Sequence, residues 1–556
     1  MGLVSPPSAQ PPQAQHTRTP REQQAWDEAA TTDISRPVAW LLVLFFAGLL
    51  AGVPLIQFIH EVRQGSLPSF TGPRPQPEVR AGERGLFAAN ARLLAGMKAY
   101  EDALAEDSVV NQAVRPWIQQ GLIALGAGNE KGYLGRDGWL FFRPGIDYLT
   151  GLPFLDERVQ KPRRMAAEES GATHHDPIRA VREFHADLEA RGIRLVLVPV
   201  PDKAQIHPER FAGGNWPVMP QNPDFARFVR EVEADGVIVH DAGPALWQAA
   251  RSGTAQFLPQ DTHWTPQAMQ AVAAAVAMTV RQRAGLELGE AEYVRQPATA
   301  SMRGDIAVML KLPPDQRRYQ PETVALQQVG TLNDNALLLW TAQRGAAVLL
   351  LGDSFSNIYS MPEMGFGQAA GFAEQLAYEL RQPVDTILQN DAGSHATRMR
   401  LSRELARGSD RLAGTKVVVW EFAIRELHAG TWKPTPLTLG TPRPSAMLAL
   451  QAGESLRAKG VIERISPAPR EGSAPYADHL RMALVRLEDG RQAVVLLRSM
   501  QDNRITPAGR LRAEQDVALL IRPYDEVSAA VDGFNKSALA DLETELPMWA
   551  ELETTP

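Results

Sequence analysis

One segment of this chain is too apolar to be left in water. Residues 37–59 read PVAWLLVLFFAGLLAGVPLIQFI and carry no charged side chain. A helix of that length, rising about 1.5 Å per residue, matches the roughly 30 Å thickness of a bilayer core. For a signal peptide the run is long, starts late and lacks a convincing cleavage site. We therefore predict a single membrane anchor at 37–60, with a buried globular helix as the alternative.

The residues on either side of this anchor say little about which side of the membrane the rest of the chain occupies. Arginines lie on both sides of the apolar run, so the positive-inside rule decides little. A single N-terminal anchor with a long chain behind it usually leaves that chain outside. We expect a single-pass inner (cytoplasmic) membrane protein whose catalytic domain faces the periplasm or the outside. Residues 1–36, rich in Pro, Gln, Ser and Thr, predict a disordered tail.

Composition excludes several kinds of chemistry. The chain has 556 residues and a formal net charge of -7, which argues against nucleic acid as the main partner. It contains no cysteine, so thiol nucleophiles, thiolate metal sites and disulfides are impossible. There is no Gly-rich phosphate loop, and the His pair at 174–175 has no matching ligand set. We expect neither a metal nor another cofactor.

Changes in local composition divide a chain of this length into several domains. Linker and amphipathic helices at 61–130 precede an α/β catalytic domain at 131–435. A Pro/Thr-rich linker at 436–452 leads to a β-rich domain at 453–530 and a helical or disordered tail at 531–556. Short strand-like runs separated by turn residues predict that the β-rich domain is a small barrel or sandwich.

The central region alternates apolar strands with helical patterns. A helix is expected at 178–192, and another at 265–285 begins with Thr265 as cap and Pro266 at its first position. The predicted strands are 193–201, 236–243, 346–354, 384–389 and 415–422. This alternation predicts an α/β fold with a parallel sheet flanked by helices. Ligands of such sheets bind beyond the carboxyl ends of the strands.

A serine lies at one of these strand ends. The run VLLLGDSFSN places Ser354 directly after an apolar strand. It is either a nucleophile or an ordinary loop serine. A serine hydroxyl attacks poorly unless a base takes its proton, and that base is usually a histidine oriented by an acid.

The sequence QDTHWTP offers such a base. Asp261 and His263 lie two residues apart, so in extended backbone they point to the same side. The alternative is that Asp261 belongs to a turn and His263 packs against Trp264. Each motif alone is weak evidence for a catalytic site. The presence of both motifs in one α/β domain is more specific evidence.

These residues resemble a known family. LLLGDSFSN and DTHW, in that chain order, are similar to the SGNH-hydrolase-like alginate O-acetyltransferases of the AlgJ/AlgX type. GRDGWLFF, VLVPVPDKAQIHPE, RGDIAVML and VVVWEFAIREL fit the same family, and the resemblance covers roughly 85–430. In this family the Asp-x-His pair precedes the serine, whereas it follows the serine in ordinary SGNH esterases. The N-terminal anchor resembles the membrane-tethered branch.

The resemblance implies roles for individual residues. Ser354 would be the nucleophile, His263 the general base and acid, and Asp261 the residue that orients His263. The backbone N–H of Ser354 and that of Gly393 would bind the oxyanion. Arg398 matches a family arginine loosely and is a further candidate for binding.

Other polar residues have two interpretations. Glu421 and Arg425 either support the site or form a structural ion pair. Lys203 and Asp202 either line the cleft or are solvated loop charges. Asp353 is expected to hold the turn rather than to take part in catalysis.

The resemblance also implies a reaction and partners. We expect acetyl transfer to a hydroxyl of a polysaccharide acceptor, with a polytopic membrane acyltransferase of the MBOAT type as acetyl donor. The alternatives are a carbohydrate acetylesterase with the same triad and a non-catalytic scaffold of an exopolysaccharide secretion complex. The sequence shows no basic stripe for an anionic polymer, and the β-rich domain could bind sugar or act as a spacer.

Overall fold

The computed structural model describes most of the chain. Its residues are 35–63, 108–169, 173–333, 336–390, 393–406, 408–441, 447–469, 478–502, 504–531, 534–539 and 547–553, with Thr19, Arg21, Met97 and Leu542. Most of the predicted N-terminal tail and nearly all of the first amphipathic helix, expected from about residue 85, lie outside this set. The chain divides into two compact units, Met1–Ile118 and Gln119–Pro556, and each is described by itself.

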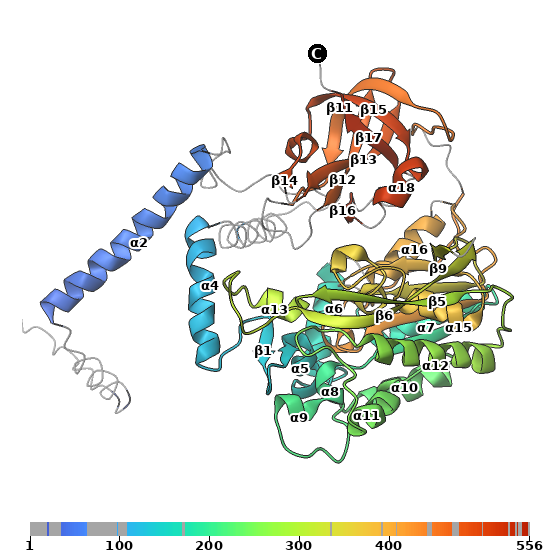
Figure 1. The fold of residues 1–556 in the computed structure, drawn as a ribbon, viewed down its shortest axis with the longest axis horizontal. Helices are drawn as coiled ribbons and strands as arrows, with labels where there is room; N and C mark the ends of the chain where they lie inside the picture. Colours follow the sequence, from blue (N-terminus) through green and yellow to red (C-terminus); the bar gives the residue numbers. More distant parts are fainter. Residues whose placement is uncertain are drawn as a thin grey trace, which may run out of the picture. The chain divides into compact units, whose positions relative to one another are not determined.

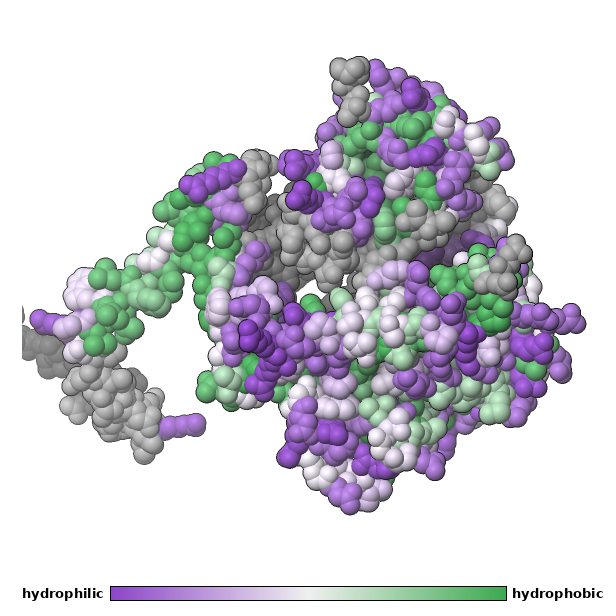
Figure 2. Space-filling model, viewed as in Figure 1, coloured by the Kyte–Doolittle hydropathy of each residue, from purple (hydrophilic) through white to green (hydrophobic). Residues whose placement is uncertain are grey.

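The N-terminal unit contains the apolar helix. Helix α2 spans Arg36–Arg63, and its most apolar window has a mean hydropathy of 2.4 with none of that window buried. Its apolar side chains are visible in Figure 2. It is long and apolar enough to cross a membrane. Helix α4, Val109–Ala124, crosses the unit boundary and agrees with the second predicted amphipathic helix.

A five-stranded sheet organises the central α/β region (Figure 1). The strands run in the order β4-β3-β10-β8-β9, and every neighbouring pair is parallel. Their bounds are β3 Arg194–Val200, β4 Ile238–Val239, β8 Val348–Gly352, β9 Val384–Leu388 and β10 Val417–Ala423. The predicted parallel α/β sheet is confirmed.

Helices cover both faces of this sheet because its strands are apolar on both sides. Alternate residues of β3 enter two separate cores, Val196 and Val198 in one, Leu195 and Leu197 in the other. The first core contains α12 (Pro266–Ala284) and α15 (Phe372–Leu380). The second contains α7 (Pro177–Glu189), α10 (Phe225–Ala234) and α16 (Ala396–Ala406).

Helix α12 begins as its sequence predicts. The Thr265 hydroxyl accepts the Ala268 N–H at 3.3 Å, and Pro266 occupies the first helical position. Gly285 ends the helix with φ 72°, in the left-handed region that favours glycine. This well-defined start holds the preceding loop, which contains Asp261 and His263.

Two antiparallel units flank the parallel sheet. A turn at Asp137-Gly138 joins β1 (Gly132–Leu134) to β2 (Leu140–Phe142), and both turn residues have positive φ. A three-stranded sheet of β5 (Val294–Met302), β6 (Glu322–Asn333) and β7 (Ala336–Leu339) was not predicted. Its strands are only partly buried, so they lack the apolar runs that identified the central sheet.

Short helices complete this region. They are α5 (Arg143–Thr150), α6 (Glu157–Glu169), α8 (Lys203–Ile206), α9 (Pro208–Phe211), α11 (Gly243–Arg251), α13 (Asp305–Met309), α14 (Ser354–Asn357), η2 (Pro362–Met364) and α17 (Glu426–Ala429). Most of them lie in the connections between strands, where the candidate site residues are found.

The C-terminal region is a closed barrel rather than a sandwich. Its strands are β11 (Leu456–Ile465), β12 (His479–Leu487), β13 (Gln492–Gln501), β15 (Asp516–Pro523) and β17 (Met548–Leu552). They pair in the ring β12-β13-β17-β15-β11-β12. Smaller elements are β14 (Arg504–Ile505), η3 (Pro507–Arg510), α18 (Asp525–Val531) and β16 (Asn535–Ser537).

One expectation for this region is wrong, and one is refined. The predicted tail at 531–556 contains β17, which pairs with both β13 and β15 and closes the ring. The start of the predicted linker packs on the catalytic region, because the Leu437 N–H donates to Asp187 at 2.9 Å and Ser402 donates to the Pro436 carbonyl at 2.6 Å.

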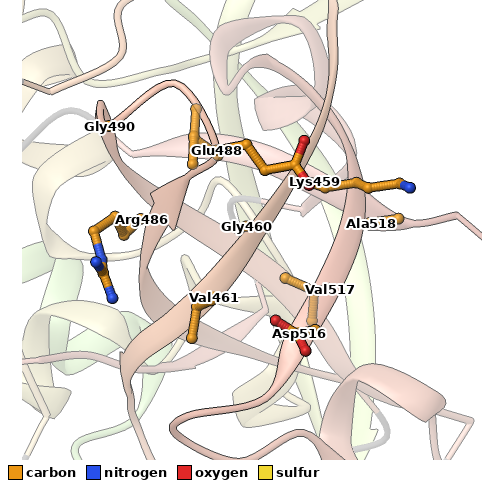
Figure 3. A pocket seen from close by; sticks show the side chains of 10 residues that line it. Lys459, Gly460, Val461, Arg486, Glu488, Gly490, Asp516, Val517 and Ala518 are labelled. Carbon is orange, nitrogen blue, oxygen red and sulfur yellow. The ribbon is translucent and has the colours of Figure 1, made fainter.

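A shallow pocket lies on the outside of the barrel (Figure 3). Lys459, Arg486, Glu488 and Asp516 are among its lining side chains. The ten lining residues include no aromatic ring, so the pocket lacks the stacking surface on which proteins commonly seat a sugar.

Candidate active site

Ser354 lies just beyond the carboxyl end of β8, the strand between β10 and β9. It is the first residue of α14, and Asp353 alone separates it from the buried strand Val348–Gly352. Asp353 fixes this turn, since its carboxylate accepts the Phe355 N–H and the Ala423 N–H, each at 2.9 Å. Asp353 therefore has the turn-holding contacts that the sequence suggested.

Asp261 and His263 form a close pair in the loop before α12. His263 Nδ1 and Asp261 Oδ1 are 2.6 Å apart, and the same carboxylate oxygen accepts the His263 N–H at 3.0 Å. Both side chains are at most 3% exposed. Burial alone would lower the pKa of His263, but the charge and hydrogen bond of Asp261 raise it above its ordinary value.

A second loop clamps this pair. The Asp305 N–H donates to Asp261 Oδ2 at 2.7 Å, and Asp305 Oδ1 accepts the Thr262 N–H at 2.7 Å. Gly304 permits the close approach, because a Cβ there would lie 2.4 Å from the Gln260 carbonyl oxygen. Burial, reinforced by the Asp261 charge, raises the pKa of Asp305 to about 6. Asp305 was not predicted to have a role, although an acidic residue directly after Gly304 at the start of a helix was a usable signal.

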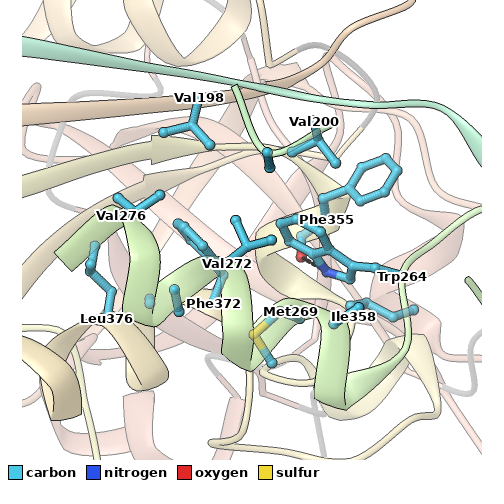
Figure 4. Close-up of a cluster of buried hydrophobic side chains, with 14 of the residues drawn as sticks. Val198, Val200, Trp264, Met269, Val272, Val276, Phe355, Ile358, Phe372 and Leu376 are labelled. Carbon is cyan, nitrogen blue, oxygen red and sulfur yellow. Dashed lines mark hydrogen bonds between the residues drawn. The ribbon is translucent and has the colours of Figure 1, made fainter. Parts of the chain in front are cut away.

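The two halves of the site pack against each other (Figure 4). Trp264 Nε1 donates to the Phe355 carbonyl at 3.1 Å, and the Tyr359 hydroxyl donates to the Trp264 carbonyl at 2.6 Å. The His263 and Phe355 rings are 4.8 Å apart between centroids. His263 therefore lies against the residue that follows Ser354.

The second ring nitrogen of His263, Nε2, is buried and makes no hydrogen bond to the described residues. It does not bond Ser354 in this structure, and catalytic hydrogen bonds of this kind often tighten only once substrate is bound. Ser354 itself is 7% exposed, so little water reaches the hydroxyl.

Gly393 lies against the serine turn. A Cβ on Gly393 would be 2.9 Å from the Cβ of Asp353, so only glycine fits without a shift. Its carbonyl accepts hydrogen bonds from Trp420 Nε1 at 2.9 Å and from the Thr397 hydroxyl at 3.0 Å. These two contacts fix the Gly393 backbone close to the residue before Ser354.

Arg398 is fully buried rather than open to substrate. Its Nε donates to the Ser394 carbonyl at 2.9 Å, and Nη1 donates to the Thr435 hydroxyl at 2.9 Å. The guanidinium carbon lies 4.8 Å from the centre of the Trp420 ring. Burial lowers the pKa of Arg398 to about 9. Arg398 therefore holds the backbone of Ser394, next to Gly393, and is too deeply buried to contact substrate directly.

Lys203 and Asp202 are buried, so the interpretation of these residues as solvated loop charges is wrong. Lys203 is 2% exposed, and its Nζ donates to the carbonyls of Leu140 at 2.8 Å and Pro259 at 3.2 Å. Burial lowers the pKa of Lys203 to about 8. Lys203 thus fastens the loop that carries Asp261 instead of lining an open cleft.

Glu421 and Arg425 make separate contacts rather than an ion pair with each other. Glu421 Oε2 accepts the Asp353 N–H at 3.0 Å and the Ser356 hydroxyl at 2.7 Å. Burial and the Asp353 charge raise the pKa of Glu421 well above its ordinary value. Arg425 instead pairs with Asp202 at 3.5 Å, and its guanidinium carbon lies 5.6 Å from the centre of the Phe355 ring.

Asp261, His263 and Asp305 also have the spacing of a metal-binding group in the described part of the chain. One ligand atom from each lies within 4.8 Å of the others. Their donor atoms already have partners inside the loop, since Asp261 binds the His263 ring and Asp305 binds the Thr262 N–H. These contacts orient the His263 ring.

Comparison with known proteins assigns this arrangement to a family. Residues 133–424, more than half of the chain, match the family described as "SGNH hydrolase-like domain, acetyltransferase AlgX". The fold and the match define an SGNH-hydrolase-like O-acyltransferase. The chain belongs to this AlgX-type acetyltransferase family.

Curated relatives carry a consistent name. The "Probable alginate O-acetylase AlgJ" of Pseudomonas aeruginosa is 26% identical over 399 residues, which are 71% of this chain and 91% of the relative. The protein of the same name from Pseudomonas syringae pv. tomato is 28% identical over 304 residues, 53% of this chain and 69% of the relative. A solved O-acetyltransferase domain of Pseudomonas putida AlgJ is 23% identical, with TM-score 0.41, and covers 54% of this chain and 93% of that chain.

Proposed function

We propose that this chain is a membrane-anchored polysaccharide O-acetyltransferase that works through an acetylated Ser354. The observation that carries the proposal is the oriented Asp261–His263 pair packed against the Ser354 turn. The names of the AlgJ relatives support a polysaccharide acceptor. The length and apolar character of helix α2 support anchoring. We further propose, from the family resemblance, that the catalytic region lies outside the cytoplasm and that a polytopic acyltransferase of the MBOAT type is the acetyl donor.

The first half-reaction loads the serine. His263 Nε2 takes the Ser354 proton as the hydroxyl oxygen attacks the acetyl carbonyl carbon of the donor. The N–H groups of Ser354 and Gly393 stabilise the resulting oxyanion. The intermediate then collapses, the bond to the donor breaks, and His263 returns the proton to the leaving group. Asp261 stabilises the charged imidazole while it holds that proton.

The second half-reaction delivers the acetyl group. His263 deprotonates a sugar hydroxyl, whose oxygen attacks the acetyl-serine carbonyl carbon. The bond to Ser354 breaks, and His263 gives the proton back to the serine oxygen. Because water could take the place of the sugar, the low exposure of Ser354 favours transfer over hydrolysis.

Substitution of the nucleophile tests this mechanism. Ser354→Ala should abolish acetylation of the protein by p-nitrophenyl acetate, because no other group in the mechanism can form the acyl-enzyme. Intact-protein mass spectrometry would detect one added acetyl group on the wild type and none on the variant. The exposed Ser252, replaced by alanine, is the matched control and should still give the acetylated species. Equal acetylation of the Ser354 variant would contradict the mechanism and favour a scaffold.

The esterase alternative needs a second measurement. Acetylated enzyme is incubated with an oligosaccharide acceptor, and the products are separated into acetyl-sugar and free acetate. Acetyl-sugar is the expected product. Free acetate alone, at every acceptor concentration, would show a carbohydrate esterase instead.

A further inference from the structure

Glu421 is a fully buried carboxyl group that contacts the turn carrying Ser354. It belongs to β10, the strand next to β8, and its side chain is 0% exposed. Gly352 at the end of β8 leaves room for this carboxyl group, because a Cβ there would lie 2.9 Å from Glu421 Oε2. The two half-reactions described above give Glu421 no part in the chemistry.

The two carboxyl oxygens of Glu421 have unlike surroundings. Oε2 accepts the Asp353 N–H at 3.0 Å and the Ser356 hydroxyl at 2.7 Å. Oε1 is buried and receives no hydrogen bond from the described residues. A buried carboxylate needs donors on both oxygens, whereas a carboxylic acid needs them on its carbonyl oxygen and is itself a donor at the other. The surroundings therefore fit a neutral acid whose Oε2 is the carbonyl oxygen and whose Oε1 carries the proton.

The charged groups around Glu421 favour the same state. Burial raises the pKa of Glu421 most, and the charge of Asp353 raises it further. A hydrogen bond between the Glu421 and Asp353 side chains acts in the same direction, and two carboxyl groups can form one only if one of them carries a proton. The pKa of Glu426, on α17, is raised by burial and by the same Asp353 charge. Arg425 pairs with Asp202, and no ion pair to Glu421 occurs among the described residues.

The contacts of Asp353 decide which of the two groups holds the proton. Its Oδ1 accepts the Phe355 N–H and its Oδ2 accepts the Ala423 N–H, each at 2.9 Å. Backbone donors of this kind stabilise a carboxylate. The negative charge therefore belongs on Asp353, which has a donor on each oxygen, and the proton belongs on Glu421 Oε1, which has none.

We propose that Glu421 is a positioning residue that works as a neutral carboxylic acid, donating from Oε1 to Asp353 and accepting on Oε2 from the serine turn. In this form it holds the N–H of the residue before Ser354 and the hydroxyl of Ser356 at the same time. It does so without placing a second negative charge near the oxyanion of the reaction. The effect on rate rests on the acyl transfer proposed above, whereas the protonation state can be measured without turnover.

Thermal unfolding of the full-length protein in detergent, followed as a function of pH, reports the protonation state. In the unfolded chain Glu421 ionises near its ordinary pKa of 4.5, while the folded protein keeps the proton to higher pH. The folded state then binds one proton more than the unfolded state, so its stability falls as the pH rises. Glu421→Gln keeps the shape and the donor but cannot ionise. Its Tm should therefore gain steadily on that of the wild type from about pH 5 to about pH 8.

An exposed glutamate provides the matched control for this measurement. Glu287 lies on the surface, and the Tm difference between Glu287→Gln and the wild type should stay constant with pH. If the Tm difference of Glu421→Gln is also constant, or shrinks as the pH rises, Glu421 is ionised in the folded protein and the proposal is overturned.

The rate of Ser354 acetylation by p-nitrophenyl acetate tests the positioning role. Glu421→Leu fills similar space without hydrogen bonds and should lower this rate about 100-fold, because the serine turn loses the acceptor that places it. Glu421→Gln should restore most of the rate. Equal rates of the leucine and glutamine variants would overturn the positioning role. A wild type that is never acetylated on Ser354 would instead overturn the proposed function, while the Tm measurement would still decide the state of Glu421.

Discussion

At the scale of single residues, the site is a histidine held from three directions. Asp261 binds its Nδ1, Asp305 holds Asp261 through a backbone N–H, and the Phe355 ring packs against the imidazole. The motifs were sufficient to select Asp261, His263 and Ser354 as candidates. Asp305 was missed because its main contribution is a backbone donor, which any residue type can supply.

Removing the charge of Asp261 should change both rate and pH dependence. Asp261→Asn should lower kcat about 100-fold or more, because the amide no longer fixes the tautomer or stabilises the charged imidazole. Asp261 raises the pKa of His263 above its ordinary value, and His263 must be neutral to act as base. The acidic limb of the kcat/KM profile should therefore move to lower pH in the variant. If the acidic limb does not move, the limb reports the ionisation of a group other than His263.

At the scale of elements, the catalytic loops are positioned by strand ends and by one another. The strands were predictable because a fully apolar run identifies a strand buried on both faces. The sheet β5-β6-β7 was not, since its strands are partly exposed and carry mixed residues. Strand β5 of this sheet ends just before Gly304 and Asp305. The contact of these two residues with the Asp261 loop could therefore not be predicted from the local sequence pattern.

Gly304 packs so closely against the Gln260–Asp261 backbone that a larger residue at this position should disturb the Asp261 loop. In Gly304→Ala the new Cβ would meet the Gln260 carbonyl and the Asp261 nitrogen, so the loop must shift. A displacement on the order of 1 Å at a catalytic group costs about 100-fold in rate, and we expect a loss of kcat of that size. Gly121→Ala, where a Cβ meets nothing within 4 Å, is the control for both kcat and thermal stability. Unchanged kcat in Gly304→Ala would show that the clamp is dispensable.

At the scale of the whole molecule, the chain combines an apolar helix, an α/β catalytic region and a β-barrel. The helix and the α/β region were apparent from composition and periodicity. The barrel was only partly apparent, because its closing strand β17 lies at 548–552, beyond a stretch without strand pattern. Closure by a parallel pairing with β13 depends on the assembled barrel rather than on neighbouring sequence.

The proposed anchor predicts the behaviour of a truncated chain. Deletion of residues 1–63 removes α2 and should move the protein from the membrane fraction to the soluble fraction. Deletion of residues 1–34 keeps α2 and is the matched control, which should remain with the membrane. Fractionation followed by immunodetection measures both. A protein that stays membrane-bound without residues 1–63 would show that another surface holds it there.

The sequence by itself determined the apolar helix, the buried strands, the cap of α12 and the order of the catalytic motifs. Each of these follows from residues within a few positions of one another, where side-chain periodicity and capping act. Only the tertiary structure decided which polar groups are buried, and it corrected the interpretations of Lys203, Arg398 and the Glu421–Arg425 pair. It also brought the Asp305 N–H to Asp261, because contacts between distant segments depend on how the segments pack together.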